Sequence, residues 1–249
     1  MGKPKIAISL DESLLTLVDG KVDGNVIRSR SQAIEFFLRK GLQGQSINTA
    51  ALLIKGDHQP ILLKKIKGKS LLTSQIEFFS RYGISSLFII TQHTRNINLI
   101  LDGISNAKIN VEIIETEAKG NAQALFAIKD RIKNSFIVMS GDIYNNFDLV
   151  KMMKKHMETD KLATMGLMTR EKITGYGTAI LDGDLIVDFQ EKPKQSSTNI
   201  VNAGIYILKP EVFELLEDAQ NLEKDLFSKL ARMKQLTGFF TYGEYEHLE

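Results

Sequence analysis

The sequence predicts an α/β protein in two parts. A short N-terminal unit of one strand and two helices precedes a Rossmann-like, mostly parallel mixed sheet flanked by helices. From Thr49 onward, apolar runs of strand length alternate with helically spaced apolar residues, which is typical of a parallel sheet covered on both faces. A polar stretch after Gly41 separates the two parts, as expected of a joint between domains.

Composition is that of an ordinary globular protein. The 249 residues are 43% hydrophobic and 25% charged, with no cysteine, so a core without disulfides is expected and thiolate metal sites are excluded. The N-terminus lacks the apolar stretch of a signal peptide, and no apolar run reaches membrane-spanning length. We therefore expect a cytoplasmic protein with no membrane partner. The net charge of +2 does not by itself indicate nucleic acid.

The N-terminal unit begins with a half-buried strand over residues 5–10, where apolar residues alternate with small or polar ones. Asp11 is the expected N-cap of a first helix. Ser31 is the expected N-cap of a second helix, and Gly41 ends it. Because one isolated strand cannot satisfy its backbone, we expect two copies to pair their strands in a homodimer. A higher oligomer is left open.

This order of strand, helix and helix resembles the ribbon-helix-helix repressors, the class of Arc and MetJ. The matching segments are KIAISLDESLLTLVD and IRSRSQAIEFFLRKGL. In that class the ribbon enters the DNA major groove, and the N-terminus of the second helix holds a phosphate. The resemblance implies a DNA-binding and dimerisation domain over residues 1–44, with pure dimerisation as the alternative. The DNA-binding residues that it implies are Lys5, Ala7, Ser9, Arg28, Arg30 and Ser31.

The larger domain is expected over residues 49–249. In its first half we expect strands over residues 50–54, 86–91, 110–114 and 135–139, and helices over 71–82, 94–105, 121–133 and 150–157. In its second half we expect strands over residues 163–168, 177–181, 185–190 and 205–208, and helices over 211–217 and 222–233. Ligands of such sheets bind beyond the carboxyl ends of the strands.

Three short motifs in this domain carry candidate chemistry. Asp142 directly follows a buried strand, where a carboxylate can hold Mg²⁺ against phosphates, although a cap or turn role is the commoner one. In Glu191-Lys192-Pro193, the lysine is a point charge suited to a phosphate, and a solvated ion pair is the alternative. Small residues from Asn202 to Gly204 would let a ligand approach the backbone, and a tight turn is the alternative.

Taken in order, the segments SGDI, GYGTAILDGD, EKP and NAGIYILKPEVFELL resemble the sugar-1-phosphate nucleotidyltransferases. The segments GKSLLTSQIEFFSRYGI and EAKGNAQAL extend the resemblance over residues 50–242. It implies a nucleotide-binding α/β fold, Mg²⁺ on Asp142 and no organic cofactor. The nucleotide-binding and sugar-binding positions that it implies are Gly120, Asn121, Ala122, Asp142, Glu191, Lys192, Asn202 and Gly204.

The sequence departs from that family in two places. The family opens with a G-x-G-T-R loop and a Pro-Lys-Pro lysine that hold the triphosphate, whereas residues 55–63 have one glycine, no Thr-Arg and Gln59 where a lysine is expected. A second metal-binding aspartate is also missing, and Glu246 or His247 is the only substitute nearby. Phosphoryl transfer depends on positioning and charge compensation, so these departures argue against turnover.

Sequence reasoning therefore favours a DNA-binding transcription regulator. Its larger domain would bind a nucleotide, a sugar phosphate or a nucleotide sugar as an effector without turnover. The alternative is an active Mg²⁺-dependent sugar-1-phosphate nucleotidyltransferase in which the N-terminal unit serves dimerisation. We assign no residue as catalytic at this point.

Overall fold

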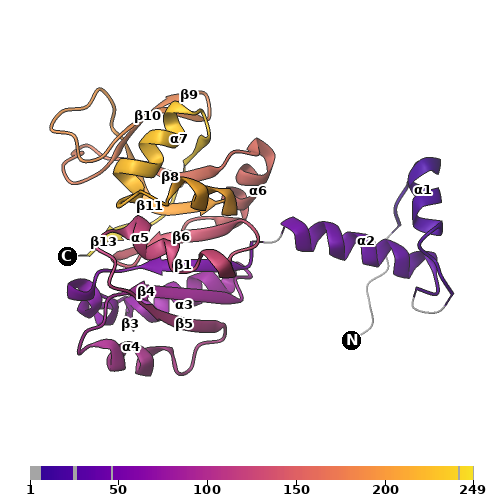
Figure 1. The fold of residues 1–249 in the computed structure, drawn as a ribbon, viewed down its shortest axis with the longest axis horizontal. Helices are drawn as coiled ribbons and strands as arrows, with labels where there is room; N and C mark the ends of the chain where they lie inside the picture. Colours follow the sequence, from indigo (N-terminus) through magenta and orange to yellow (C-terminus); the bar gives the residue numbers. More distant parts are fainter. Residues whose placement is uncertain (1–6, 25–26, 46, 241, 249) are drawn as a thin grey trace. The chain divides into compact units, whose positions relative to one another are not determined.

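The chain forms two compact units, Met1–Ser46 and Ile47–Glu249, drawn in Figure 1. This is a computed structural model, and it describes residues 7–24, 27–45, 47–240 and 242–248. The joint between the units falls in the polar stretch that follows Gly41. Within the described residues, no helix is both long enough and apolar enough to cross a membrane.

The smaller unit contains two helices, α1 (Glu12–Asp19) and α2 (Arg30–Gln45). Asp11 is the N-cap of α1, because its carboxylate accepts a hydrogen bond from the backbone N–H of Leu14 at 2.9 Å. Among the described side chains, the buried apolar residues of this unit are Val18, Ile27 and Ala33. Such a core is small even for a unit of this length.

The strand expected over residues 5–10 is not found in the described residues. Lys5 lies outside them, and residues 7–10, which include Ala7 and Ser9, are exposed and have no regular structure. A strand requires a hydrogen-bonding neighbour, and no described segment of this unit supplies one.

The second helix begins slightly earlier than expected and ends later. Ser29 precedes it and accepts a hydrogen bond from the backbone N–H of Gln32 at 3.3 Å, so Ser31 lies exposed in the first turn rather than at the cap. The backbone N–H of Arg28 donates to the Gln32 side chain at 2.6 Å. The helix also continues past Gly41, because a glycine inside a helix weakens it without ending it.

Arg30 does not present a free guanidinium to a phosphate. Its Nε and one terminal nitrogen donate to the two carboxylate oxygens of Asp19 at 2.7 and 2.8 Å. This bidentate pair raises the pKa of Arg30 and lowers the pKa of Asp19. The arginine that was expected to contact DNA therefore joins the two helices of its own unit.

The larger unit is built on a nine-stranded mixed sheet in the order β5-β4-β1-β6-β11-β8-β12-β10-β9. Its strands are β1 (Thr49–Leu53), β4 (Ser86–Thr91), β5 (Asn110–Glu115), β6 (Phe136–Ser140), β8 (Ala163–Thr169), β9 (Thr178–Asp182), β10 (Leu185–Gln190), β11 (Ile200–Leu208) and β12 (Leu236–Phe240). The first four strands of that order pair in parallel, and β11 runs antiparallel to both β6 and β8. The mixed α/β fold expected from the sequence is confirmed, but the sheet is not mostly parallel, because β9, β10 and β11 pair antiparallel with their neighbours.

Two short pairs lie outside this sheet. One joins β2 (Lys65–Ile66) to β3 (Lys69–Ser70), and the other joins β7 (Ile143–Asn145) to β13 (Tyr245–His247). The β7–β13 pair matters for the site, because it brings residues near position 247 beside the segment that follows β6.

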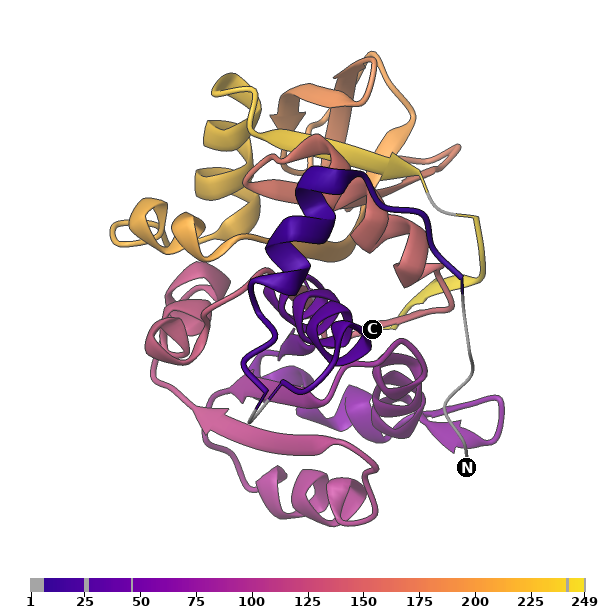
Figure 2. The ribbon, with the colours of Figure 1, turned by 90° about the vertical axis from the view of Figure 1, so that its right-hand side faces the viewer.

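Helices cover both faces of the sheet. They are α3 (Leu71–Arg81), α4 (Ile97–Ile104), α5 (Asn121–Phe126), α6 (Leu149–Thr159) and α7 (Ser228–Arg232), with the 3₁₀ segments η1 (Gly56–Leu63), η2 (Lys129–Arg131) and η3 (Pro210–Leu215) and the π-helix η4 (Leu222–Phe227). Alternate side chains of β1 enter opposite cores, Leu52 on the side of α3 and Ala51 on the side of α5. Figure 2 shows α5 and α7 to the left of the sheet.

One histidine lies within the packing of α6 against β8. His156 is 1% exposed, and its Nδ1 and Nε2 contact the hydroxyls of Thr164 and Ser135 at 2.9 and 3.2 Å. Burial, together with the positive charge of Lys209, lowers the pKa of His156 to about 4. The imidazole is therefore neutral in the folded protein at neutral pH.

The His156→Gln substitution should remove one pH dependence of stability. Below about pH 6.5 the unfolded chain binds a proton at this residue that the folded chain does not, so folding weakens as the pH falls toward 4. We expect this residue to account for about 2 kcal/mol of the loss between pH 6.5 and 4.5. Urea unfolding of both proteins over this range measures it. The exposed His93→Gln is the control, and parallel stability curves for wild type and His156→Gln would contradict the prediction.

Candidate active site

A cavity of about 560 Å³ lies beyond the carboxyl ends of β1, β4 and β6. Parallel pairing places Leu53 of β1 opposite Ile90 of β4 and Ser140 of β6, so the segments that follow these strands surround one space. The polar side chains of its wall are Lys55, His58, Thr91, Gln92, Thr116, Lys119, Asn121, Ser140, Asp142, Glu191, Lys192, Tyr206, Asn221, Glu223, Lys224 and His247.

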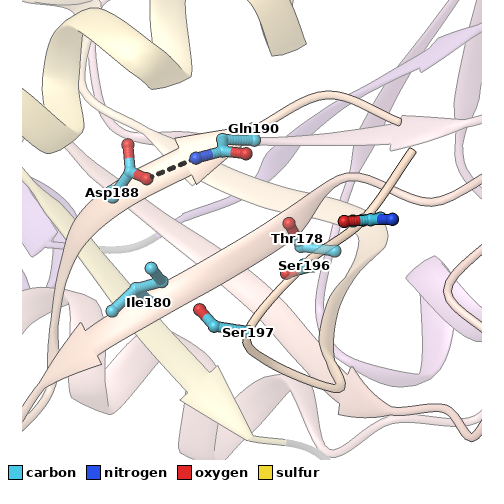
Figure 3. A pocket seen from close by; sticks show the side chains of 7 residues that line it. Thr178, Ile180, Asp188, Gln190, Ser196 and Ser197 are labelled. Atoms are coloured by element: carbon cyan, nitrogen blue, oxygen red, sulfur yellow. Dashed lines mark hydrogen bonds between the residues drawn. The ribbon is translucent and has the colours of Figure 1, made fainter. Parts of the chain in front are cut away.

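A smaller hollow of about 180 Å³ lies between β9, β10 and residues 195–197, as Figure 3 shows. Its one charged side chain is Asp188, whose carboxylate accepts a hydrogen bond from the Gln190 side chain at 2.8 Å. With no cation in its wall, this hollow is poorly suited to a phosphate. The larger cavity contains the charged motifs and is the candidate active site.

The turn that carries Asp142 is held against the sheet by backbone and amide contacts. The N–H of Gly141 donates to the carbonyl of Leu53 at 2.7 Å. A Cβ at Gly141 would lie 2.7 Å from the Cβ of Ile54, so only glycine fits there. Behind the turn, the buried side chain of Gln75 on α3 donates to the carbonyl of Gly141 at 3.0 Å. Sequence reasoning missed Gln75, which looked like one polar residue within an amphipathic helix.

The Asp142 carboxylate faces the cavity between a hydroxyl and two imidazoles. Ser140 donates to its Oδ1 at 2.6 Å, while its Oδ2 lies 3.5 Å from Nε2 of His247 and 3.9 Å from Nδ1 of His58. Burial raises the pKa of Asp142, but hydrogen bonds from His247 and Ser140 outweigh it, so this pKa lies below its ordinary value. The carboxylate is therefore ionised at neutral pH. Of the two substitutes considered from the sequence, it is His247 and not Glu246 that reaches Asp142.

The segment after β1 is a compact 3₁₀ turn rather than a glycine-rich phosphate loop. Gln59, which stands where a lysine was expected, is fully buried. Its Nε2 donates to Oγ1 of Thr91 at 2.9 Å and to the carbonyl of Gln92 at 2.7 Å, and the Thr94 hydroxyl donates to its Oε1. Gln59 therefore fixes η1 to the end of β4 and does not replace the lysine.

Positive charge in the cavity wall comes from separate elements. Among the described residues, the lysines that line it are Lys55, Lys119, Lys192 and Lys224, and no arginine does. Lys64 and Lys65, which seemed near from the sequence, are not part of the wall. The wall therefore offers several cations to phosphates, but without the rigid fork of an arginine.

Two carboxylates face each other on the opposite wall. Glu191 follows β10, and burial together with the negative charge of Glu223 raises its pKa to about 7. Glu223, on the π-helix η4, accepts hydrogen bonds from the Asn121 side chain at 2.8 Å and from the Tyr206 hydroxyl at 3.5 Å. Asn121 also accepts from the backbone N–H of Leu222 at 2.8 Å. Sequence reasoning missed Glu223 and Tyr206, whose motifs gave no signal for this wall.

Three residues expected at the ligand lie behind the wall. Ala122 is fully buried under α5. Asn202 is buried, donates to the Tyr206 hydroxyl at 2.7 Å and accepts from the N–H of Gly204 at 2.8 Å. Neither Asn202 nor Gly204 lines the cavity, and the Asn202 amide holds the Tyr206 hydroxyl that does. Gly120 does line the cavity, and a Cβ there would lie 2.0 Å from a backbone oxygen of the segment before η4.

Comparison with known families decides the identity of the fold. The family model described as nucleotidyl transferase matches residues 56–241. The chain belongs to the nucleotidyl transferase family. Residues 56–241 contain both the altered segment after β1 and the Asp142 turn, so the departures from the signature loop lie within a recognisable member of the family.

Curated relatives of the chain are sugar-nucleotide transferases. It is 33% identical over 146 residues to the mannose-1-phosphate guanylyltransferase catalytic subunit beta of Drosophila pseudoobscura pseudoobscura, which covers 53% of this chain and 39% of that protein. It is 27% identical over 194 residues to the mannose-1-phosphate guanyltransferase of Saccharomyces cerevisiae, covering 74% and 54%. The chain spans about half the length of the curated relatives it matches.

Several solved structures share the fold of this chain. UDP-glucose pyrophosphorylase complexed with UDP-glucose matches with a TM-score of 0.66 at 18% identity, covering 80% of this chain and 92% of that one. HddC from Yersinia pseudotuberculosis matches with a TM-score of 0.67 at 22% identity, covering 81% and 93%. At these identities the likeness concerns the architecture alone.

The interpretation as a DNA-binding transcription regulator is wrong. The curated relatives are mannose-1-phosphate guanylyltransferases, so the family favours an enzyme over a domain that binds without turnover. The family match begins only at residue 56, and no comparison supports a ribbon-helix-helix module in residues 1–44. The altered loop does not exclude catalysis, because it lies within the family match.

Replacing Glu223 with Gln should lower the pKa of Glu191 below its value of about 7. The substitution removes a neighbouring negative charge, but burial remains, so the pKa should stay above 4.5. The ¹³C chemical shift of the Glu191 carboxyl, assigned with Glu191→Gln and followed from pH 4 to pH 9, measures it. Glu217→Gln, outside the cavity wall, is the control. An unchanged midpoint in Glu223→Gln would contradict this picture of the wall.

Proposed function

We propose that the larger unit transfers a nucleotidyl group from a nucleoside triphosphate to a sugar 1-phosphate and releases pyrophosphate. The observation that carries the proposal is the ionised Asp142 carboxylate in a cavity whose wall also contains Asn121, Glu191 and Lys192. The curated relatives support the proposal, because they are mannose-1-phosphate guanylyltransferases, which belong to this class of transferase. This was the alternative reading of the sequence.

In this reaction an oxygen of the sugar phosphate forms a bond to the α-phosphorus. The bond from that phosphorus to the β-phosphate oxygen breaks, and pyrophosphate leaves. Lys55 follows β1, the parallel neighbour of β6, and Lys119 precedes α5; both line the cavity and suit the triphosphate, whereas Lys192 beside Glu191 suits the sugar phosphate. Four separate lysines can together offset the charge that the signature arginine would meet, because catalysis of this step consists mainly of positioning and charge compensation.

Glu191 and Tyr206 form the proposed sugar side of the cavity. The Glu191 carboxyl accepts hydrogen bonds from sugar hydroxyls when ionised, and its pKa of about 7 means that it is half-protonated near neutral pH. Tyr206 is fixed by Asn202 and by Glu223, so its hydroxyl has one orientation. A rigid polar wall of this kind selects ligands by the placement of their hydroxyls.

The residues present fit a divalent cation. Ser140 occupies Oδ1 of Asp142, which leaves Oδ2 facing the cavity. No group of three His, Cys, Asp or Glu side chains in the described residues could hold a metal ion, so phosphate oxygens and water would complete its shell, as is usual at nucleotide sites. Bound there, a cation would neutralise phosphate charge. Mg²⁺ is the ion expected from the sequence, and the family's chemistry is consistent with it.

The first substrates to test are GTP and mannose 1-phosphate. This choice comes from the names of the curated relatives. The cavity wall gives no independent reason to prefer guanine, because its base-facing segment around Gly120 and Asn121 uses its amide to bind Glu223 and Leu222.

The Asp142→Asn substitution should abolish pyrophosphate release from GTP and mannose 1-phosphate, with a loss of at least about 100-fold. The amide keeps the shape of the side chain but removes the negative charge that a cation needs. A coupled pyrophosphate assay over a panel of triphosphates, sugar 1-phosphates and divalent cations measures it. Asp102→Asn on α4, outside the wall, is the control. A folded wild type that shows no turnover with any pair, or an active Asp142→Asn, would refute the proposal.

We further propose that the N-terminal unit associates with a second copy of itself. The large apolar residues that it exposes are Ile8, Leu10, Leu14, Leu17, Phe37 and Leu38. These side chains are between 39% and 66% exposed, so a partner that buries the ~800 Å² of a standard interface can cover them. A unit with so small a core commonly gains its stability by association. A second copy exposes the same apolar side chains and is always present at the same concentration, so it is the partner that we propose.

Leu17→Lys should convert the assembly to a smaller species. Leu17 is 66% exposed, so a lysine there should leave the fold of the unit intact while it places a charge in the interface. Analytical ultracentrifugation at micromolar concentration measures the mass. Leu99→Lys is the matched control, since Leu99 is 50% exposed on α4 of the larger unit. A monomeric wild type, or equal masses for wild type and Leu17→Lys, would show that the apolar face has no such role.

A further inference from the structure

We infer that the cation site of this chain is formed by Asp142 and His247 together, and that it prefers a first-row transition-metal dication to Mg²⁺. The inference deepens the proposed function, on which it rests for the phosphates that complete the site. Its own basis is the donor set at the end of β6.

The geometry brings two donor atoms to one point. Nε2 of His247 lies 3.5 Å from Oδ2 of Asp142. Two ligands at about 2.1 Å from one ion lie roughly 3.0 Å apart in an octahedral shell and roughly 3.4 Å apart in a tetrahedral one. The observed separation therefore needs only a small side-chain movement. Because Ser140 binds the other carboxylate oxygen, Oδ2 is the oxygen available to an ion.

The position of His247 is set by the backbone rather than by chance contact. β13 pairs antiparallel with β7, with His247 opposite Ile143, and the N–H of Leu248 donates to the carbonyl of Asp142 itself at 2.9 Å. The ring also lies 6.5 Å from the ring of Tyr176. This arrangement holds the imidazole at the mouth of the Asp142 turn, at the point where the sequence resemblance expects a second aspartate.

The replacement of a carboxylate by an imidazole changes which ion suits the site. Mg²⁺ binds oxygen ligands and parts reluctantly from water, whereas imidazole nitrogen is a good ligand for zinc, iron, nickel and related ions. Without His247, all the donor atoms of the site would be oxygens, from Asp142 and the phosphates. His58 lies near the same Oδ2, with its Nδ1 at 3.9 Å, but it does not complete a three-donor group with Asp142 and His247 in the described residues. A site with one carboxylate and one imidazole therefore loses its preference for Mg²⁺.

The decisive experiment titrates the full chain with Co²⁺ alone, without nucleotide or sugar. Visible absorption and calorimetry measure the affinity, competition with Mg²⁺ measures the preference, and hyperfine-shifted imidazole N–H signals in the ¹H NMR spectrum report a coordinated histidine. We expect such a signal in the wild type and its loss in His247→Asp. The preference for Co²⁺ over Mg²⁺ should fall about tenfold in that variant, a scale typical of changes around a metal.

Two variants serve as comparisons. His93→Asp alters an imidazole that pairs with Glu115 outside the cavity wall, and it should bind Co²⁺ as the wild type does. His58→Ala tests whether the shifted signal comes from the other imidazole, and the signal should persist in it.

Three outcomes would overturn the inference: no Co²⁺ binding, equal affinity for Co²⁺ and Mg²⁺, or a Co²⁺ spectrum that does not change in His247→Asp. In each of these the imidazole would act only as a hydrogen-bonding partner of Asp142. The readouts need no turnover. Intact Co²⁺ binding in a protein that releases no pyrophosphate would refute the proposed function alone, whereas full activity with Mg²⁺ and no Co²⁺ preference would refute the inference alone.

Discussion

The parallel pairing of β1 with both β4 and β6 is the constraint on which the site depends. β1 is buried on both faces, so its register with its neighbours is set by packing. That register ends the three strands at one edge and allows the Gly141 N–H to reach the Leu53 carbonyl. Asp142 follows by one residue. A side chain at Gly141 would separate β6 from β1 and move the carboxylate out of the cavity.

In the site, uncharged amides hold the backbone turns in place, whereas charged side chains face the cavity. Gln59 and Gln75 hold the two turns nearest Asp142, and both are buried and hydrogen-bonded. The charged side chains stand on other elements and face the cavity. The family's glycine-rich loop combines these roles by binding phosphate with its backbone. In this chain the segment after β1 is fixed to the end of β4 by Gln59, and the lysines of the cavity wall come from separate elements.

Much of the fold could be read from the sequence, because strands buried on both faces are continuous apolar runs and the helices between them are amphipathic. Asp142, Glu191 and Lys192 could be singled out because their motifs follow strands directly, and all three line the cavity. Gln59 and Gln75 could not be found, because a buried amide in a helix looks like any polar residue until its partner is known. Asn202 does not line the cavity, and β11 shifts register between Asn202 and Tyr206, an irregularity that sequence does not reveal.

Sequence alone also does not reveal which of two neighbouring residues, Glu246 or His247, faces Asp142. Neighbouring residues of a strand point to opposite sides, so which of the two meets Asp142 depends on how β13 pairs with β7. The prediction of a strand in the N-terminal unit failed for a different reason. Its strand requires a partner that no described part of one chain supplies, so a single sequence cannot establish it.

The buried amides have a consequence for how solution conditions act on this protein. Gln59 and Gln75 carry no charge and do not titrate, so neither ionic strength nor pH in the physiological range alters the hydrogen bonds that these two amides make. The lysines of its wall are accessible to screening ions. Added salt should therefore lower the affinity for an anionic ligand while the shape of the empty cavity stays the same. In this protein, ligand affinity and cavity shape thus respond differently to salt.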